Sequence, residues 1–273
     1  MIFELGLLRL AIVLYLGGTV AALTGIAVRQ ELPRALLRQL LWAGFAAHGA
    51  SIAVRSWNAG HLAVTTFDEA LSFLALLLVA LFLFVQLRRP LLALGAVVSP
   101  LAFGLTLAAD AVYRGARPLP PALDSAWLPV HVVLSCLGDA VFALAFSASL
   151  LYLVQERRLK AHRRGLLRFL PSLETLDRLN YACLVWGLIL LTLGIVSGIV
   201  WAHTAWLGFW SSDPKLVFSL VTWGIYVILL QGRMTAGWRG RWAATLTIAG
   251  FAVIVISLVG VNVLALGQHG KAF

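Results

Sequence analysis

The sequence is poor in charged residues, and this shortage limits the class of protein that it can be. Lysine, arginine, aspartate and glutamate make up 12% of its 273 residues, whereas hydrophobic residues make up 61% and the mean hydropathy is +0.94. A chain of this length could fill one or two soluble domains, but such domains need more polar surface than this. The composition therefore excludes an ordinary soluble protein and indicates a polytopic membrane protein.

Cysteine is also scarce, with only Cys136 and Cys183 and no C-x-x-C pair. Both fall in predicted membrane spans, near opposite faces, so their depths differ by roughly 15–20 Å at about 1.5 Å per residue. A disulfide needs Cα atoms within about 7 Å of each other. The two cysteines are therefore predicted not to pair, and thiol–disulfide exchange is excluded as the chemistry of this chain.

Acidic residues are few as well: eleven Asp and Glu stand against twenty-one Lys and Arg, which gives a formal net charge of +10. In a soluble protein this excess would suggest nucleic acid as a partner. Here the basic residues cluster between apolar runs, and no basic stripe interleaves with aromatic residues. We therefore exclude nucleic acid and expect membrane lipid as a partner, with the basic segment Glu156–Arg168 against anionic headgroups.

The sequence does contain long apolar runs, each near the ~20 residues that cross ~30 Å of hydrocarbon. The predicted fold is all-α, a polytopic membrane protein with a bundle of eight transmembrane helices in a single integral-membrane domain over 1–273. The first run is too long and too weakly charged at its start for a cleaved signal peptide. The predicted spans are 5–28, 39–55, 70–87, 91–110, 129–154, 178–200, 215–231 and 243–265.

The basic residues divide unevenly between alternate loops, and this division predicts the orientation of the chain. Fifteen of the twenty-one Lys and Arg lie in one set of loops. The other six lie at the two ends and in the alternate loops: Arg9, Arg55, Arg114, Arg117, Lys215 and Lys271. The loops of the basic set are 29–38, 88–89, 156–178 and 232–242. Because positively charged loops stay in the cytoplasm, both termini are predicted to lie outside.

The stretch from Trp201 to Lys215 is unusually aromatic, with three Trp, a Phe and a His within ten residues. Asp is a good N-cap and Pro is favoured at the first helical position, so Asp213 and Pro214 are predicted to start the next helix. The aromatic residues before them are predicted to form a loop on the outer side. An interfacial aromatic belt and a platform for a flat apolar ligand both explain this composition.

The segment Trp206-Leu-Gly-Phe-Trp-Ser-Ser-Asp-Pro-Lys215, followed by Thr222-Trp223, resembles the motif W-G-x-(F/Y)-W-x-W-D-P-K-E of the tryptophan-rich haem-handling proteins of cytochrome c assembly. These include the CcsA, ResC and CcmC types and the shorter HemX- and YpjD-like members, which the chain resembles most in size. Ser212 stands where the family has its last Trp, and Leu216 where it has Glu.

A second segment, Leu170-Pro-Ser-Leu-Glu-Thr-Leu-Asp177, is similar to the L-P-S-L-E-x-L-D of the same family. Pro171 ends the basic run before it, and Ser172 is predicted to cap a helix that begins at Leu173. The resemblance covers about residues 60–273. It implies a multi-pass protein of the bacterial inner (cytoplasmic) membrane.

Four of the six histidines are predicted to face outward with the aromatic loop: His61, His131, His203 and His269. Imidazole is a common axial ligand of haem, although an isolated His at a membrane edge is more often a hydrated interfacial side chain. The family has one outward His a helix before its Trp-rich loop and another after its last helix. The resemblance therefore implies His131 and His269 as the metal ligands.

The same resemblance implies the rest of a haem site. Aromatic rings would stack on the macrocycle, and Lys215 or the Arg114–Arg117 segment would neutralise the propionates. Only its position within the aromatic stretch supports a role for His203, which is interpreted as a hydrogen-bond donor that lines the pocket. The predicted cofactor-binding residues are His131, His269, Trp206, Phe209, Trp210, Asp213, Lys215 and His203.

Two further polar groups are predicted within the membrane. His48 is interpreted either as an interhelical hydrogen-bonding group or as half of an intramembrane haem site, and Gln231 stands where larger members have the other His. Asp139 shares a helix face with His131 and Ser135, so it should face the protein interior, with Arg9, Asn262 or a main-chain group as its partner. Asp68 and Glu69 favour a helix start.

These interpretations predict a membrane protein that binds haem and handles or presents it at the outer face for cytochrome c assembly. The iron chemistry would belong to the cofactor, so no enzyme is expected, and partners would be another assembly subunit or an apocytochrome. A HemX-like regulator or scaffold of haem biosynthesis, which does not present haem, is the alternative. A small-molecule transporter, coupled through Asp139 and His48, is a third hypothesis that no repeat or broken-helix pair supports.

Overall fold

The structure is a computed structural model that describes residues 2–28, 32–88, 91–115, 125–161, 170–206 and 214–263. Within these ranges all regular structure is helical, which confirms the predicted fold class. The helices are α1 (Ile2–Val28), α2 (Leu32–Ala59), α3 (Phe67–Arg88), the 3-10 turn η1 (Leu92–Leu94), α4 (Gly95–Ala111), α5 (Trp127–Lys160), α6 (Leu173–Trp206), α7 (Pro214–Thr235) and α8 (Arg241–Val263).

Among the described residues, seven helices are long and apolar enough to cross a membrane, and the chain is a multi-pass membrane protein. The helix that does not reach this hydropathy is α2, because polar residues such as His48, Ser51 and Arg55 interrupt its apolar sequence. Seven predicted spans therefore have apolar helical counterparts. The span predicted at 39–55 lies in α2, and its crossing of the membrane and the outward termini stay predictions.

The start and end of α6 test the local signals in the sequence. Ser172 Oγ accepts the N–H of Thr175 at 3.1 Å, which confirms the predicted cap before Leu173. The predicted end of this helix was wrong, because Trp201 to Trp206 continue α6 instead of forming a loop. Trp201 is 1% exposed, so burial of its ring extends the helix beyond the apolar run. Residues 207–213 lie outside the described residues.

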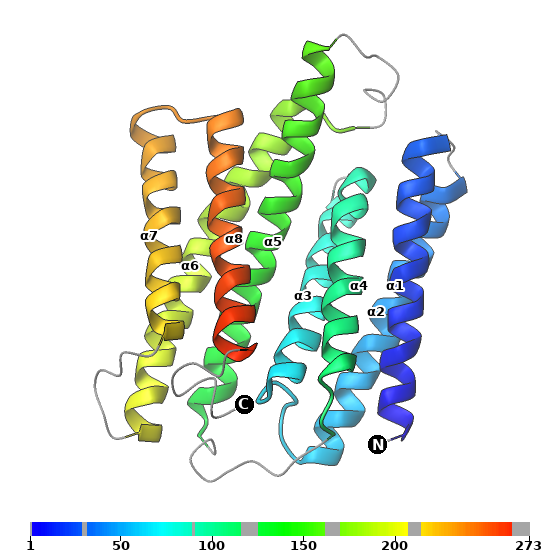
Figure 1. Ribbon diagram of the computed structural model, residues 1–273, viewed down its shortest axis with the longest axis vertical. Coiled ribbons are helices and arrows are strands. Elements are labelled where there is room, and N and C mark those ends of the chain that lie inside the picture. Colours follow the sequence, from blue (N-terminus) through cyan, green and yellow to red (C-terminus); the bar gives the residue numbers. More distant parts are fainter. Residues whose placement is uncertain are drawn as a thin grey trace. The chain divides into compact units, whose positions relative to one another are not determined.

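The chain forms two compact units. The first comprises 1–63, 68–118 and 154–175, and it contains α1 to α4. In this unit α1 packs against α2 and α4 (Figure 1, blue to green). Tyr15 of α1 is fully buried, and a Cβ at Gly44 of α2 would come within 2.6 Å of its ring, so the two helices meet at a glycine.

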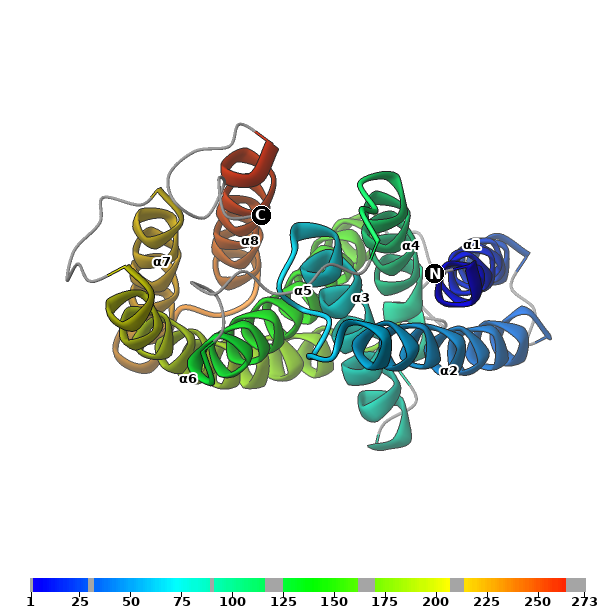
Figure 2. The ribbon, with the colours of Figure 1, turned by 90° about the horizontal axis from the view of Figure 1, so that it is seen from below.

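The second unit comprises 64–67, 119–153 and 176–273. Its helices α7 and α8 lie side by side and are joined by a turn in which Gly237 and Gly240 have positive φ (Figures 1 and 2). Its core includes Phe142 and Tyr226, whose rings stack at 3.8 Å between centroids. The prediction of one domain over 1–273 stays a prediction.

Candidate functional site

His131, near the start of α5, is held by the main chain of α6. Its Nδ1 lies 2.8 Å from the carbonyl oxygen of Gly194. A carbonyl can only accept, so Nδ1 carries the proton, and the lone pair of the neutral ring is then on Nε2. Ser135 Oγ is 3.4 Å from the same Nδ1, which confirms that these two residues share a helix face. His131 therefore has the tautomer in which imidazole coordinates a metal through Nε2.

The flat side of the His131 ring lies against α6. Trp201 stacks on the imidazole with an interplanar angle of 11° and 6.0 Å between ring centroids. A Cβ at Gly198 would come within 2.7 Å of His131 Cε1 and 2.8 Å of Nδ1. A Cβ at Gly194 would come within 2.9 Å of Ser135 Oγ. The absence of side chains at Gly194 and Gly198 is what lets α5 approach α6 so closely here.

The structure describes only part of the predicted cofactor site. His203 is exposed on α6, and Lys215 is partly exposed as the second residue of α7. Trp206 ends α6, but its side chain lies outside the described residues, as do the following predicted site residues: Phe209, Trp210, Asp213 and His269. The structure therefore places His131 against Trp201, a residue that the sequence analysis did not assign to the site. The pairing of His131 with His269 stays a prediction.

The described residues contain no group of three or more His, Cys, Asp or Glu placed to hold a metal ion. A haem iron does not need such a group, because the porphyrin supplies four ligands and the protein adds one or two axial ones. Cys136 and Cys183 are both buried and unpaired with each other, as predicted. Among the described residues, His131 offers an oriented imidazole, and the partly exposed His61 also has its Nδ1 3.1 Å from a main-chain carbonyl, that of Leu62.

His48 has a different environment, deep in the first unit. Its Nδ1 is hydrogen-bonded to the Tyr15 hydroxyl at 3.3 Å, and its Nε2 to the Ser72 hydroxyl at 2.8 Å. The ring is fully buried and links α1, α2 and α3. This confirms the interpretation of His48 as an interhelical hydrogen-bonding group. To bind iron, His48 would have to give up one of these two hydrogen bonds. Gln231, which stands where larger members have the second His, is an exposed side chain.

The predicted partner of Asp139 was partly wrong. Arg9 Nε pairs instead with Asp110 at 3.2 Å, on the helix α4 that packs against α1. The side chain of Asn262 lies outside the described residues. Asp139 itself is half-buried on α5, two turns below His131 on the same face. Sequence spacing placed it on the correct face but could not identify a partner on another helix.

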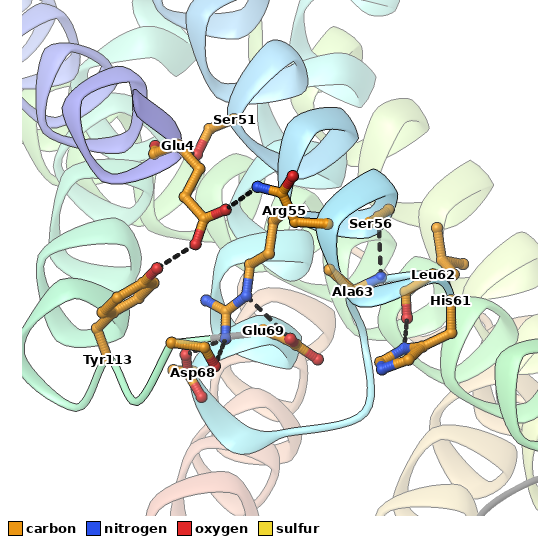
Figure 3. Close-up of polar contacts among 12 residues, drawn as sticks. Glu4, Ser51, Arg55, Ser56, His61, Leu62, Ala63, Asp68, Glu69 and Tyr113 are labelled. Carbon is orange, nitrogen blue, oxygen red and sulfur yellow. Dashed lines mark hydrogen bonds and ion pairs between the residues drawn. The ribbon is translucent and has the colours of Figure 1, made fainter. Parts of the chain in front are cut away.

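A buried ion cluster at one end of the first unit was missed by the sequence analysis (Figure 3). Arg55 was counted among loop cations, but it belongs to α2 and is 6% exposed. Its Nη2 lies 2.8 Å from Asp68 Oδ2, and its Nε lies 2.9 Å from Glu69 Oε1. Its Nη2 also donates to the Gly115 carbonyl at 3.2 Å, and the guanidinium lies over the Tyr113 ring. Asp68 and Glu69 do start α3, as predicted, and they also neutralise this guanidinium.

Glu4 of α1 completes this cluster (Figure 3). Its carboxylate accepts Nδ2–H of Asn58 at 2.9 Å and the hydroxyl of Tyr113, and its main-chain carbonyl accepts Ser51 Oγ at 2.7 Å. Burial, reinforced by the Glu4 carboxylate, raises the pKa of Tyr113 to about 12, so the phenol stays a donor. The cluster joins α1, α2, α3 and the segment after α4. Buried charges are costly unless they are paired, and here the pairing holds four segments together.

The helices, the buried ion pairs and the oriented imidazole define a polytopic helical membrane protein with a potential metal-ligand site on α5 and α6. Comparison with known proteins gives the family: the chain belongs to the cytochrome c assembly proteins, whose family model matches residues 40–269. Its role is therefore in cytochrome c assembly. This confirms the resemblance that the Trp-rich motif and the segment around Asp177 predicted.

Individual relatives agree with this assignment. The chain is 32% identical over 269 residues to the cytochrome c biogenesis protein CcsA of Synechococcus sp. (strain CC9605), covering 89% of this chain and 88% of that one. It is 34% identical over 232 residues to CcsA of Guillardia theta, covering 78% and 77%. Among solved structures it is similar in fold to the cytochrome c heme lyase CcmF, with a TM-score of 0.72 at 18% identity. That match covers 100% of this chain and 48% of CcmF.

Proposed function

We propose that this chain binds haem at the outer face of the bacterial inner (cytoplasmic) membrane, through His131 and His269, and presents it for cytochrome c assembly. The observation that carries this proposal is the hydrogen bond from His131 Nδ1 to the Gly194 carbonyl. Metal-binding histidines commonly donate their second ring N–H to a carbonyl or carboxylate, which fixes the tautomer and raises the basicity of the other nitrogen. The environment of His131 fits an axial ligand, and that of His48 does not.

The other predicted site residues would retain and orient the cofactor. Trp206, Phe209 and Trp210 would stack on the macrocycle, as flat apolar surfaces do in porphyrin sites. Lys215, at the start of α7, would neutralise a haem propionate through a hydrogen bond between its ammonium group and the propionate carboxylate. Asp213 would cap α7. His203, which is exposed near the end of α6, would donate a hydrogen bond to the cofactor from the edge of the proposed site.

The bound haem would supply the iron and its redox chemistry, and the chain would supply ligands, orientation and access. An apocytochrome or another assembly subunit would take the haem from the outer face. Nothing in this role requires a catalytic residue of the chain, so we keep the proposal that it is not an enzyme. The words "heme lyase" belong to the name of CcmF, with which this chain shares its fold.

A HemX-like scaffold that regulates haem synthesis without presenting haem is the second candidate. It is favoured by two departures from the family motif, Ser212 in place of Trp and Leu216 in place of Glu. Both departures fall in the segment that would contact the cofactor. The two candidates share the fold, the family and the membrane, and they differ only in whether haem binds.

The test is an absorption spectrum of the detergent-purified protein before and after addition of haemin. We expect a Soret band that His131→Ala weakens and shifts and that exogenous imidazole partly restores, while His48→Ala leaves it in place. If His48→Ala abolishes the band and His131→Ala and His269→Ala are silent, the site lies inside the membrane and the proposal is wrong. If the parent protein binds no haemin, the scaffold role replaces it.

A further inference from the structure

We infer that Trp201, Gly198 and the carbonyl of Gly194 form a socket on α6 that positions His131. The socket selects the Nδ1–H tautomer and fixes the plane of the ring, so that the lone pair of the neutral imidazole is on Nε2 before any ligand arrives. The role toward haem rests on the proposed function. The tautomer and ring plane do not, and they can be measured on the haem-free protein.

The hydrogen bond accounts for the tautomer. The Gly194 carbonyl, 2.8 Å from Nδ1, cannot donate, so the contact exists only while Nδ1 is protonated. In the neutral ring the proton is then absent from Nε2. A hydroxyl partner would not impose this choice, because it can donate to one tautomer and accept from the other. A main-chain carbonyl also cannot rotate away without unwinding α6.

The glycines account for the closeness of the ring to α6. Gly194 and Gly198 are four residues apart and share a helix face; Ser135 lies against the first position and the His131 ring against the second. A methyl group at Gly198 would sit within 2.7 Å of Cε1 and 2.8 Å of Nδ1, distances that carbon contacts do not tolerate. The ring would have to move away from α6, and the hydrogen bond to Gly194 would lengthen.

Trp201 accounts for the ring plane. It follows Gly198 by one helical turn, is 1% exposed, and stacks on the imidazole at an interplanar angle of 11°. The second side-chain torsion of His is broad and roughly two-fold in proteins, so a hydrogen bond alone leaves the ring some freedom. The buried indole restricts the remaining rotation. A ligand held in one orientation binds more tightly, because less freedom is lost when the metal is bound.

The first experiment uses the full chain in detergent, without haem, labelled with nitrogen-15 at histidine. In the parent we expect His131 to show a protonated Nδ1 and an unprotonated Nε2. Trp201→Leu and Gly198→Ala should give a mixture of tautomers, whereas Trp201→Phe, which keeps a stacking ring, should retain the parent signal. Gly104→Ala is the matched glycine control, because a Cβ at Gly104 meets no atom within 4 Å.

The second experiment titrates the same proteins with haemin. Loss of an outer-shell partner typically weakens metal binding by about 10–100-fold, and we expect a weakening in this range for Gly198→Ala and Trp201→Leu. Trp201→Phe and Gly104→Ala should bind as the parent does. Thermal unfolding of each variant separates a loss of His131 positioning from a loss of folding. If Gly198→Ala does not fold, the haemin affinities of Trp201→Leu and Trp201→Phe still test the role of the stacking ring.

The outcomes separate the inference from the proposed function. A parent His131 that is protonated at Nε2, or tautomers that none of the variants changes, would overturn the inference whatever haemin does. A parent with the expected tautomer that binds no haemin would support the socket and refute the proposed function. Haemin affinity that falls in Gly198→Ala and Trp201→Leu together with a mixed tautomer would support both.

Discussion

His48 and His131 both lie on long helices with the ring against a neighbouring helix, yet their partners differ in kind. His48 has a hydroxyl at each ring nitrogen, at 3.3 Å and 2.8 Å. His131 has a main-chain carbonyl 2.8 Å from Nδ1 and an indole against its face. Hydroxyls satisfy either tautomer of His48, whereas the carbonyl selects one tautomer of His131. The chemistry of the partner therefore separates a histidine that can adopt either tautomer from one with a fixed tautomer, which is the tautomer that the proposed axial ligand needs.

The comparison extends to the two units that contain these residues. In the first unit the polar groups are paired with one another: Arg55 with Asp68 and Glu69, and Glu4 with Asn58 and Tyr113. In the second unit, Arg233 pairs with Asp177 at 2.7 Å, away from His131 near the opposite end of α6. We therefore expect polar substitutions in the first unit to change stability and substitutions around His131 to change ligand binding.

The largest effect that would test this division is expected for Arg55→Leu. It leaves the carboxylates of Asp68 and Glu69 buried without their cation, which typically costs about 3–5 kcal/mol of unfolding free energy. Unfolding by denaturant in detergent would measure the loss, with haemin binding by the folded fraction unchanged. Arg9→Leu is the matched control, because its pair with Asp110 has an arginine side chain that is 63% exposed and should contribute little. Equal losses in both variants would contradict the assignment of the cluster.

His131→Ala is expected to have the next largest effect, this time on binding. Haemin affinity should fall by at least the ~100-fold that marks the upper end of outer-shell losses, because a ligand itself is removed. Imidazole added to the solution should restore part of the spectrum, since the other proposed contacts to haem persist. Unfolding free energy should change less than in Arg55→Leu. Affinity that stays at the parent value would remove His131 from the site.

His48→Leu reverses this pattern and so tests the comparison of the two histidines directly. The substitution removes the shared partner of Tyr15 and Ser72, and unfolding free energy should fall by about 1–3 kcal/mol for the buried hydroxyls left unsatisfied. Haemin affinity and spectrum should remain those of the parent. A double variant, His48→Leu with Tyr15→Phe, should recover part of the stability, because one orphaned hydroxyl is then absent. A changed haem spectrum would show that His48 is a ligand after all.

The smallest effect is a pH dependence at Tyr113. Its pKa in the folded protein, about 12, is raised above the ordinary value of 10.0, first by burial and then by the Glu4 carboxylate. A raised pKa contributes stability that is fully present below the unfolded value and is lost as pH rises through the folded one. The difference in stability between the parent and Tyr113→Phe should therefore shrink between pH ~10 and ~12. A difference that does not vary with pH in this window would show that Tyr113 does not titrate there.

The fold was largely predictable from the sequence, and the reasons are local. Apolar runs near 20 residues predict membrane helices. Ser172 and Pro214 predict the starts of α6 and α7, because capping and the missing N–H of proline are properties of the local backbone. The end of α6 was not predictable in this way. Trp201 to Trp206 stay helical because Trp201 is buried against a ring on another helix, and no local signal carries that information.

The candidate site was predicted by residue type and not by environment. Family resemblance pointed to His131, and helical spacing placed Ser135 on its face. The socket was missed, because Gly194 and Gly198 look like ordinary small residues of a membrane helix until the helix that crosses them is known. Arg55 was also misplaced, since charge counting by loops cannot recognise a cation whose partners, Asp68 and Glu69, follow it in the chain and neutralise it.

The polar character of α2 has a consequence for how the chain enters the bilayer during synthesis. An isolated helix is admitted according to its summed transfer free energy, and charged residues oppose insertion, by about 2.5–3.5 kcal/mol for an arginine at the centre of a span and by less for one near its end, as Arg55 is. Arg55 and His48 make α2 less apolar than the seven other long helices among the described residues. The polar partners of α2 come from both neighbours in sequence: Glu4 and Tyr15 of α1 are hydrogen-bonded to Asn58 and His48, and α3 contributes Ser72, Asp68 and Glu69.

The segment α2 is therefore expected to insert with help, as part of a group with the helices before and after it. Emergence of α1 first provides the phenol for His48, and emergence of α3 provides the carboxylates for Arg55. Until α3 has left the ribosome, α2 would be retained at the insertion machinery or at the interface. The ion cluster that fastens the finished unit thus also sets the earliest moment at which the first three helices can be released together into lipid.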